Sequence, residues 1–231
     1  MQDIQLATDI IIGILALQGA FAEHQAMLQH ISRKGHLEVI QVRTPEELKR
    51  CDALIIPGGE SSTIALLARL SGLIEPLREF VKTKAVWGTC AGAILLSQAV
   101  SNPKKGGQEL LGGVSVTTTR NGWGSQVESF EAPLEVRGLR DADVPFMGIF
   151  IRAPVITELL PAPHEPPIEV ISRIPDSLLP HRTTPDGDPT QTVVALRQGR
   201  HLLTTFHPEL TGDNRFHEYF VQECVVASLA P

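Results

Sequence analysis

Short apolar runs alternate with stretches of helical spacing over the first hundred residues of the chain. The runs cover residues 10–17, 39–42, 53–56 and 85–87. They are largely apolar and rich in β-branched residues, as expected of strands that are buried on both faces of a parallel sheet. Each run therefore predicts a buried strand.

Helices are predicted between these strands. Apolar residues at helical spacing predict them over residues 22–31, 62–70, 73–82 and 93–100. Thr44-Pro45-Glu46-Glu47 has the pattern of a capping box with proline at the first helical position, and it predicts a further short helix. Strands that alternate with helices indicate βαβ units. We expect a three-layer α/β fold, with a mostly parallel central sheet and helices on both faces.

The pattern changes in the second half of the chain. Clusters of β-forming residues at 114–119, 127–136, 146–150 and 168–172 predict an antiparallel extension of the sheet, and 193–196 with 202–205 predict a hairpin. A helix is predicted over 214–229. Eight prolines between Pro161 and Pro189 indicate a surface excursion at about 161–191. Without an internal repeat or a linker, we expect one domain over residues 1–231.

Composition excludes several classes of protein. With 42% hydrophobic and 20% charged residues, the chain has the make-up of a globular protein and not of a disordered one. A net charge of −6 argues against binding of a nucleic-acid backbone as the main task. The start of the chain lacks a signal-peptide pattern, and its first apolar run is too short to span a bilayer. We expect a cytoplasmic protein that binds neither membranes nor nucleic acid.

Cys90 is the strongest candidate for a catalytic residue. It lies where a buried strand meets a helix, in Gly88-Thr89-Cys90-Ala91-Gly92, a pattern typical of a nucleophile elbow. A helix N-terminus favours the thiolate, and the N–H of Ala91 can point at a developing oxyanion. Cys51 and Cys224 have no such context, and their spacing suggests no zinc site, so we interpret them as reduced, buried structural cysteines.

His207-Pro208-Glu209 follows the last predicted strand and supplies a possible base. Pro208 keeps His207 out of the α region, and in an extended segment Glu209 would face the same side as the imidazole. The three residues then form a chain from nucleophile Cys90 to base His207 to orienting carboxylate Glu209. The other seven histidines, among them His24 and His217, are interpreted as surface or core residues.

Two glycines end the third predicted strand. In Pro57-Gly58-Gly59-Glu60-Ser61 they let the backbone approach a ligand, and the N–H of Gly59 could complete an oxyanion hole. A phosphate-binding loop is a poor alternative, because the lysine and glycine spacing of a P-loop are absent. The remaining alternative is a turn that only ends a strand.

Together these motifs resemble the class I, triad-type glutamine amidotransferases. A finer match covers nearly the whole chain and is similar to the glutaminase subunits of pyridoxal 5′-phosphate synthase. It is carried by Leu15–Gly19 with Glu23-His24, Pro57–Thr63, Arg120-Asn121, Gln126–Glu131, Phe150–Pro154 and Thr205–Thr211. One departure is Ser125, which stands where many members of this family carry arginine.

The resemblance implies hydrolysis of L-glutamine to glutamate and ammonia. It implies that the ammonia passes to a separate (β/α)₈-barrel synthase subunit, and that no cofactor or metal takes part. Cys90 would be the nucleophile, His207 the base and Glu209 its orienter. The glutamine-binding positions of the family fall on Gly59, Glu60, Ser61, Arg120, Ile151 and Arg152. Gln18-Gly19 and Glu23-His24 are interpreted as contributors to the docking face, or as residues that only end a strand and begin a helix.

Two other functions stay open at this point. The first is a glutaminase that serves another acceptor, or a γ-glutamyl hydrolase or peptidase. Arg120 and the motifs at 126–131 and 151–154 argue against it. The second is a catalytically idle binding subunit, and the intact Cys90, His207 and Glu209 argue against that.

Overall fold

The computed structural model describes residues 9–32, 37–103, 107–120, 122, 129–179 and 188–229. Its first half confirms the predicted alternation of strands and helices. The elements are β1 (Ile10–Leu15), α1 (Phe21–Ser32), β2 (Leu37–Val42), α2 (Pro45–Lys49), β3 (Ala53–Ile56), α3 (Ser61–Leu70), α4 (Ile74–Thr83), β4 (Ala85–Thr89) and α5 (Ala91–Leu96).

Local sequence explains two of these elements directly. Every residue of β3 is buried, as an apolar run between two neighbouring strands requires. Helix α2 begins with the predicted capping box: the N–H of Glu47 donates to Thr44 Oγ1 at 3.3 Å, and the N–H of Thr44 donates to Glu47 Oε2 at 3.0 Å. Two donors that the first turn leaves unpaired are thus satisfied.

The second half contains mostly strands. They are β5 (Ser97–Ser101), β6 (Val114–Thr119), β7 (Ser129–Leu134), β8 (Phe146–Ile151), β9 (Val155–Leu159), β10 (Ile168–Arg173), β11 (Val193–Gln198) and β12 (His201–Thr204). The predicted hairpin is confirmed, because β11 and β12 pair antiparallel. The helix predicted over 93–100 is wrong at its end: α5 stops at Leu96, and Ser97–Ser101 pairs with β6 instead. Strand β9 was not predicted.

The central sheet has seven strands in the order β10-β11-β12-β4-β3-β1-β2. β12, β4, β3, β1 and β2 pair parallel, and β10 and β11 form the antiparallel extension. The predicted extension is only partly right. Strands β6 and β9 join β5 in a separate three-stranded sheet, and β7 pairs with β8 in a two-stranded one.

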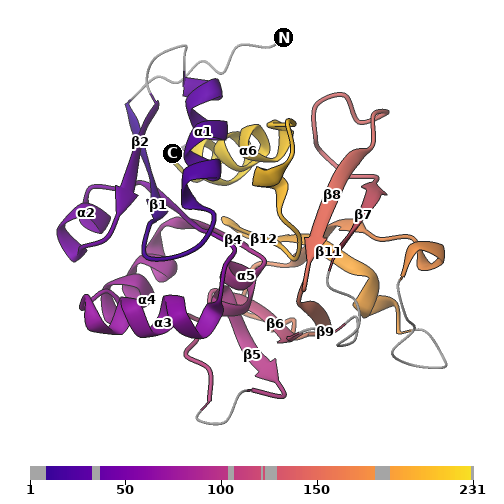
Figure 1. The fold of residues 1–231 in the computed structure, drawn as a ribbon, viewed down its shortest axis with the longest axis horizontal. Helices are drawn as coiled ribbons and strands as arrows, with labels where there is room; N and C mark the ends of the chain where they lie inside the picture. Colours follow the sequence, from indigo (N-terminus) through magenta and orange to yellow (C-terminus); the bar gives the residue numbers. More distant parts are fainter. Residues whose placement is uncertain are drawn as a thin grey trace.

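Two hydrophobic clusters cover the two faces of the central sheet. One contains residues of α1, the C-terminal helical segment and β7–β8, while the other contains residues of α3, α4 and α5. Figure 1 shows α1 and α6 (Arg215–Tyr219) on one side of the strands and α3 and α4 on the other. Helices α1 and α6 are thus neighbours, although they lie near opposite ends of the chain.

The predicted C-terminal helix is less regular than expected. Helix α6 continues into a π-helix over Phe220–Val226 and then into α7 (Ala227–Leu229). In the proline-rich excursion, β10 forms as predicted, and a 3₁₀ helix, η1, covers Asp176–Leu178. Residues 161–167 are exposed, and 180–187 lie outside the described residues.

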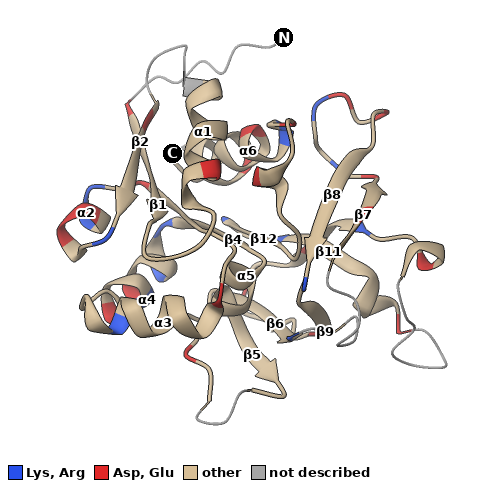
Figure 2. Ribbon diagram, viewed as in Figure 1, with Lys and Arg blue, Asp and Glu red and all other residues tan. Residues whose placement is uncertain are grey.

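Charge is spread over the described surface. Figure 2 shows lysine and arginine dispersed among aspartate and glutamate along the ribbon. On α4, for example, Lys82 pairs with Glu79 and Arg78 pairs with Glu75. Among the described residues, no helix is both long and apolar enough to cross a bilayer.

Candidate active site

Three adjacent parallel strands carry the candidate catalytic segments at one edge of the sheet. Strand β4 lies between β3 and β12, and all three run in the same direction. The Gly58-Gly59 loop follows β3, Cys90 follows β4, and His207 follows β12. Because the carboxyl ends of parallel strands meet at the same edge, the fold brings these segments together from distant parts of the sequence.

Cys90 occupies the sharp turn between β4 and α5. Its φ angle is +47°, a conformation that non-glycine residues rarely adopt. The turn depends on close backbone contact, since a Cβ on Gly92 would lie 1.9 Å from the carbonyl oxygen of Ile56. The N–H of Cys90 donates to the carbonyl of Thr204 at 2.9 Å. The strained conformation and the flanking glycines are those of a nucleophile elbow.

His207 and Glu209 lie beside Cys90. The N–H of His207 donates to the carbonyl of Ile149 at 2.8 Å, and its Nδ1–H donates to Glu209 Oε1 at 2.7 Å. Both side chains are buried. The expected extended segment is only partly right: His207 is outside the α region, but Pro208–Leu210 forms a 3₁₀ helix, η3. The tight turn, and not strand alternation, returns Glu209 to the imidazole.

The surroundings of His207 favour a charged ring. Burial by itself would lower the pKa of His207, but hydrogen bonds to Cys90 and Glu209 and their negative charges outweigh it and raise the pKa to about 10. The ring is therefore protonated at neutral pH, and it faces the Cys90 sulfur. Burial raises the pKa of the Cys51 thiol and that of the Cys224 thiol to about 12.

The glycine loop after β3 packs against this pair. A Cβ on Gly58 would lie 2.3 Å from His207 Cε1, so only glycine leaves room for the imidazole. The Gly58 carbonyl accepts the N–H of Ala20 at 3.0 Å, and the N–H of Glu60 donates to Gln18 Oε1 at 2.9 Å. Residues 18–20, which follow β1, thus support the loop that contains Gly59.

The predicted glutamine-binding residues form a polar group at the start of α3. Arg120 donates to Glu60 Oε1 at 2.6 Å and to Ser61 Oγ at 2.8 Å. Its third partner is Gln108 Oε1, at 3.0 Å, a residue that the sequence analysis missed because it follows no strand and belongs to no recognised motif. Glu60 also caps α3, accepting the N–H of Thr63 at 2.8 Å.

The backbone of Ile151, the last residue of β8, approaches the thiol. The Cys90 thiol lies 3.9 Å from the carbonyl oxygen of Ile151. Arg152 follows with a φ of +45° and an exposed side chain. The motif at 126–131 lies partly outside the described residues, as does Ser125, and its contacts are therefore not described.

Comparison with known proteins decides the family. Residues 14–226 match the profile of the SNO glutamine amidotransferase family. The chain belongs to this family.

Relatives and solved structures agree with that assignment. The amidotransferase is 45% identical to the pyridoxal 5'-phosphate synthase subunit PdxT of Roseiflexus sp. (strain RS-1), over 91% of this chain and 98% of the relative. It is 43% identical to PdxT of Dehalococcoides mccartyi (strain ATCC BAA-2100 / JCM 16839 / KCTC 5957 / BAV1), over 91% and 95%. A crystal structure described as a glutamine amidotransferase has a TM-score of 0.73 and 39% identity, over 91% of this chain and 97% of the other.

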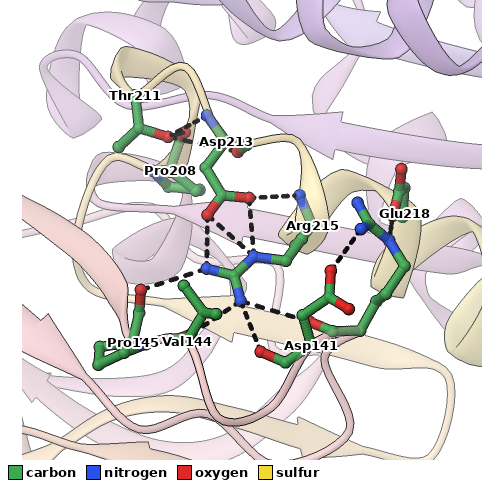
Figure 3. Close-up of polar contacts among 9 residues, drawn as sticks. Asp141, Val144, Pro145, Pro208, Thr211, Asp213, Arg215 and Glu218 are labelled. Carbon is green, nitrogen blue, oxygen red and sulfur yellow. Dashed lines mark hydrogen bonds and ion pairs between the residues drawn. The ribbon is translucent and has the colours of Figure 1, made fainter.

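A buried arginine outside the predicted site supports the amidotransferase segment that contains His207. Arg215 donates to the carboxylate of Asp213, with Nη2 at 2.6 Å, and to the carbonyls of Val144 and Pro145 at 2.8 and 3.2 Å (Figure 3). Thr211 links the same cluster to Pro208, whose carbonyl accepts its hydroxyl at 2.9 Å. The arginine thus ties η3 to the loop that leads into β8.

We expect Arg215→Met to destabilise the amidotransferase by about 3 kcal/mol, because it leaves a carboxylate and several carbonyls without their buried partner. Urea unfolding measures the change in the free energy of unfolding. Arg140→Met is the matched control: Arg140 pairs with Glu218 and Asp141 but is about half exposed, so we expect its loss to cost less than about 1 kcal/mol. Equal effects of the two variants would contradict the assigned structural role.

Proposed function

We propose that this chain hydrolyses L-glutamine to L-glutamate and ammonia, and supplies the ammonia to a pyridoxal 5′-phosphate synthase subunit. The observation that carries the proposal is the buried group of Cys90, His207 and Glu209 at the carboxyl edge of the sheet. The family and the names of the relatives support the substrate and the acceptor. Within this proposal, residues 1–231 act as one amidotransferase domain.

The first half of the reaction uses the charged pair. The Cys90 thiolate attacks the side-chain amide carbon of glutamine, and the carbonyl π electrons move onto oxygen. The N–H groups of Gly59 and Ala91 stabilise that oxyanion. The carbon–nitrogen bond then breaks, and the His207 imidazolium donates its Nε2 proton to the leaving nitrogen. The products are ammonia and a γ-glutamyl thioester on Cys90.

The second half regenerates the enzyme. His207, now neutral, accepts a proton from water, which attacks the thioester carbon. The carbon–sulfur bond breaks, so glutamate leaves and the Cys90 thiolate again faces the His207 imidazolium. Glu209 accepts the Nδ1–H of His207 and stabilises the charged ring.

Glutamine is held by groups around this pair. Arg120 binds its α-carboxylate, since a guanidinium matches the geometry of a carboxylate. The remaining polar groups of glutamine bind Glu60, Ser61 and the backbone of Gly59 and Ile151. Arg152 belongs to the same side of the glutamine site.

The cysteines fit a cytoplasmic location. No disulfide links Cys51, Cys90 or Cys224, which suits a cysteine enzyme that works in a reducing cytoplasm.

The partner is a (β/α)₈-barrel synthase subunit. Free ammonia is lost to protonation and diffusion, so hydrolysis is useful only when an acceptor is docked. The Gly58-Gly59 loop, with Gly59 at a φ of +156°, has the backbone freedom to change its peptide orientation when the partner binds.

The residues predicted to contribute to the docking face differ in exposure. Glu23 is exposed, whereas the His24 side chain is fully buried and does not reach the surface.

Ammonia release from glutamine tests the proposal. We expect a low rate for the chain alone and a rate up to about 10²-fold higher with a saturating synthase subunit, because docking completes the oxyanion hole. Steady-state glutaminase assays with and without the subunit measure both rates, with Cys90→Ala as the blank. An equal rate without the partner would favour a free γ-glutamyl hydrolase, and no ammonia under either condition would favour an idle subunit.

A further inference from the structure

Two fully buried histidines lie directly behind the catalytic group. His24 comes from α1 and His217 from α6, and neither is exposed. His24 Nδ1 is 2.9 Å from His217 Nε2, and His24 Nε2 is 3.2 Å from the hydroxyl oxygen of Thr89, the residue before Cys90. The pair thus connects two helices to the strand that ends at the nucleophile.

His24 also faces the oxygen of the Glu209 carboxylate that does not contact His207. Glu209 Oε1 accepts the proton of His207, while Oε2 is buried and makes no hydrogen bond to any described residue. His24 Nε2 approaches Oε2 to 3.4 Å. Burying a carboxylate oxygen without a nearby donor costs free energy of folding. An N–H group at His24 Nε2 therefore has a large effect on the orientation of Glu209.

The arrangement selects one tautomer for each ring. Nδ1 of His217 is buried and has no partner among the described residues. If His24 donated from Nδ1 to His217, then His217 would bury an unpaired N–H, and the lone pair of His24 Nε2 would face the Glu209 carboxylate. With the proton order reversed, His217 Nε2–H donates to His24 Nδ1, and His24 Nε2–H points toward Thr89 and Glu209. The second order leaves only a bare acceptor unpaired, which costs less than an unpaired donor.

Both rings are neutral at physiological pH. Burial, together with the nearby His217 and His207, lowers the pKa of His24 well below its ordinary value. Burial lowers the pKa of His217 to about 3. The 3.4 Å contact with Glu209 is therefore an electrostatic contact between a neutral N–H group and the carboxylate, and not an ion pair.

We propose that His24 is a positioning residue of the glutaminase reaction: its Nε2–H, which is within hydrogen-bond distance of Thr89 Oγ1, also lies against Glu209 Oε2 and so helps to hold Oε1 against His207. The inference rests on the proposed function for its kinetic consequence. His217 fixes the tautomer of His24. It is the last residue in the series of contacts that runs from His207 through Glu209 and His24. The alternative is that His24 is a core histidine whose only role is to pack α1 against the sheet.

The tautomers are measured on the wild-type chain, without reference to activity. Long-range ¹H–¹⁵N correlation spectra distinguish Nε2–H from Nδ1–H rings, and spectra of His24→Gln and His217→Gln assign the two signals. We expect neutral Nε2–H tautomers for both residues. An Nδ1–H tautomer at His24, or a charged ring, would overturn the proposal whether or not the chain hydrolyses glutamine.

Two substitutions of similar shape then separate positioning from packing. In His24→Gln the amide nitrogen can occupy the place of Nε2 and donate to Glu209, whereas His24→Met fills the space without a donor. In the complex with the synthase subunit, we expect His24→Met to lower kcat about 10- to 100-fold with KM for glutamine within about twofold, because the base is misplaced. We expect His24→Gln to recover kcat to within about fivefold of wild type.

The controls use an exposed histidine of the same helix. His30 lies on the surface of α1, so His30→Gln and His30→Met should leave kcat unchanged. Thermal unfolding is recorded for every variant, so that kcat refers to folded protein. If both His24 variants lose stability but keep kcat, or lose kcat equally, the positioning role is wrong. If wild type with its partner releases no ammonia while His24 shows the expected tautomer, the proposed function fails and the His24–Glu209 contact stands.

Discussion

Cys90→Ala abolishes ammonia release from glutamine, with kcat expected to fall by about 10⁴-fold or more. In the proposed mechanism the Cys90 sulfur is the atom that forms the covalent bond, and no neighbouring side chain can replace it. The fold should survive, since the turn depends on the glycines around Cys90 and on its backbone N–H, which donates to Thr204. Steady-state ammonia assays and a thermal unfolding curve of the same preparation measure both effects. Normal ammonia release by this variant would remove Cys90 from the mechanism.

Cys51→Ala is the matched control for that substitution. Cys51 is buried, its thiol donates to the carbonyl of Glu47, and burial raises its pKa to about 12. Such a thiol is inert at neutral pH. We expect unchanged kcat and a loss of about 1 kcal/mol in the free energy of unfolding from the smaller side chain. A folded but inactive Cys51→Ala protein would show that the wrong thiol had been chosen.

His207→Ala is expected to lower kcat/KM by about 10⁴-fold, and Glu209→Gln by about 10²-fold. The alanine removes the acid and base itself. The glutamine keeps a hydrogen bond to the imidazole but loses the charge that stabilises imidazolium. Parallel kcat/KM measurements at neutral pH compare the two variants. Equal or reversed losses would mean that Glu209 does more than orient and stabilise His207.

The interaction between His207 and Glu209 makes the stability of the fold depend on pH. The pKa of His207 is raised from 6.5 to about 10, so the stability that its protonation contributes is complete below pH 6.5 and is lost as the pH rises through about 10. In Glu209→Gln this contribution is smaller, because the opposing charge is gone. Its loss should therefore begin at lower pH than in wild type, and urea unfolding between pH 6 and 10 measures the difference.

Much of the fold was predictable because its signals are local. The apolar run at 53–56 became β3 with the same bounds, and the capping box at Thr44 formed as predicted. The turn at Cys90 was predictable for the same reason: a strand, a helix and the glycines between them are adjacent in sequence. The hairpin of β11 and β12 also depends on neighbours only.

Errors occurred where distant partners compete with local preference. Residues 97–100 were assigned to the helix predicted over 93–100, but pairing with β6 makes Ser97–Ser101 strand β5. Strand β9 forms only because β6 lies beside it, and local pattern gave no sign of that pairing. Apart from β5 and β9, the sequence indicated the strands of the second half, but it could not distribute them over three sheets, since long-range pairing is set by packing.

By itself the sequence determined which residues we propose as catalytic, because Cys90, His207 and Glu209 stand in short motifs whose backbone requirements are local. Only the tertiary structure decided how they are held. Parallel pairing of β12 with β4 brings His207 to Cys90 across more than a hundred residues. Packing of α1 against α6 buries His24 behind Glu209, although the sequence motif placed it at the docking face or at the start of a helix. Such contacts depend on which apolar surfaces are buried against one another, and that is a property of the whole folded chain.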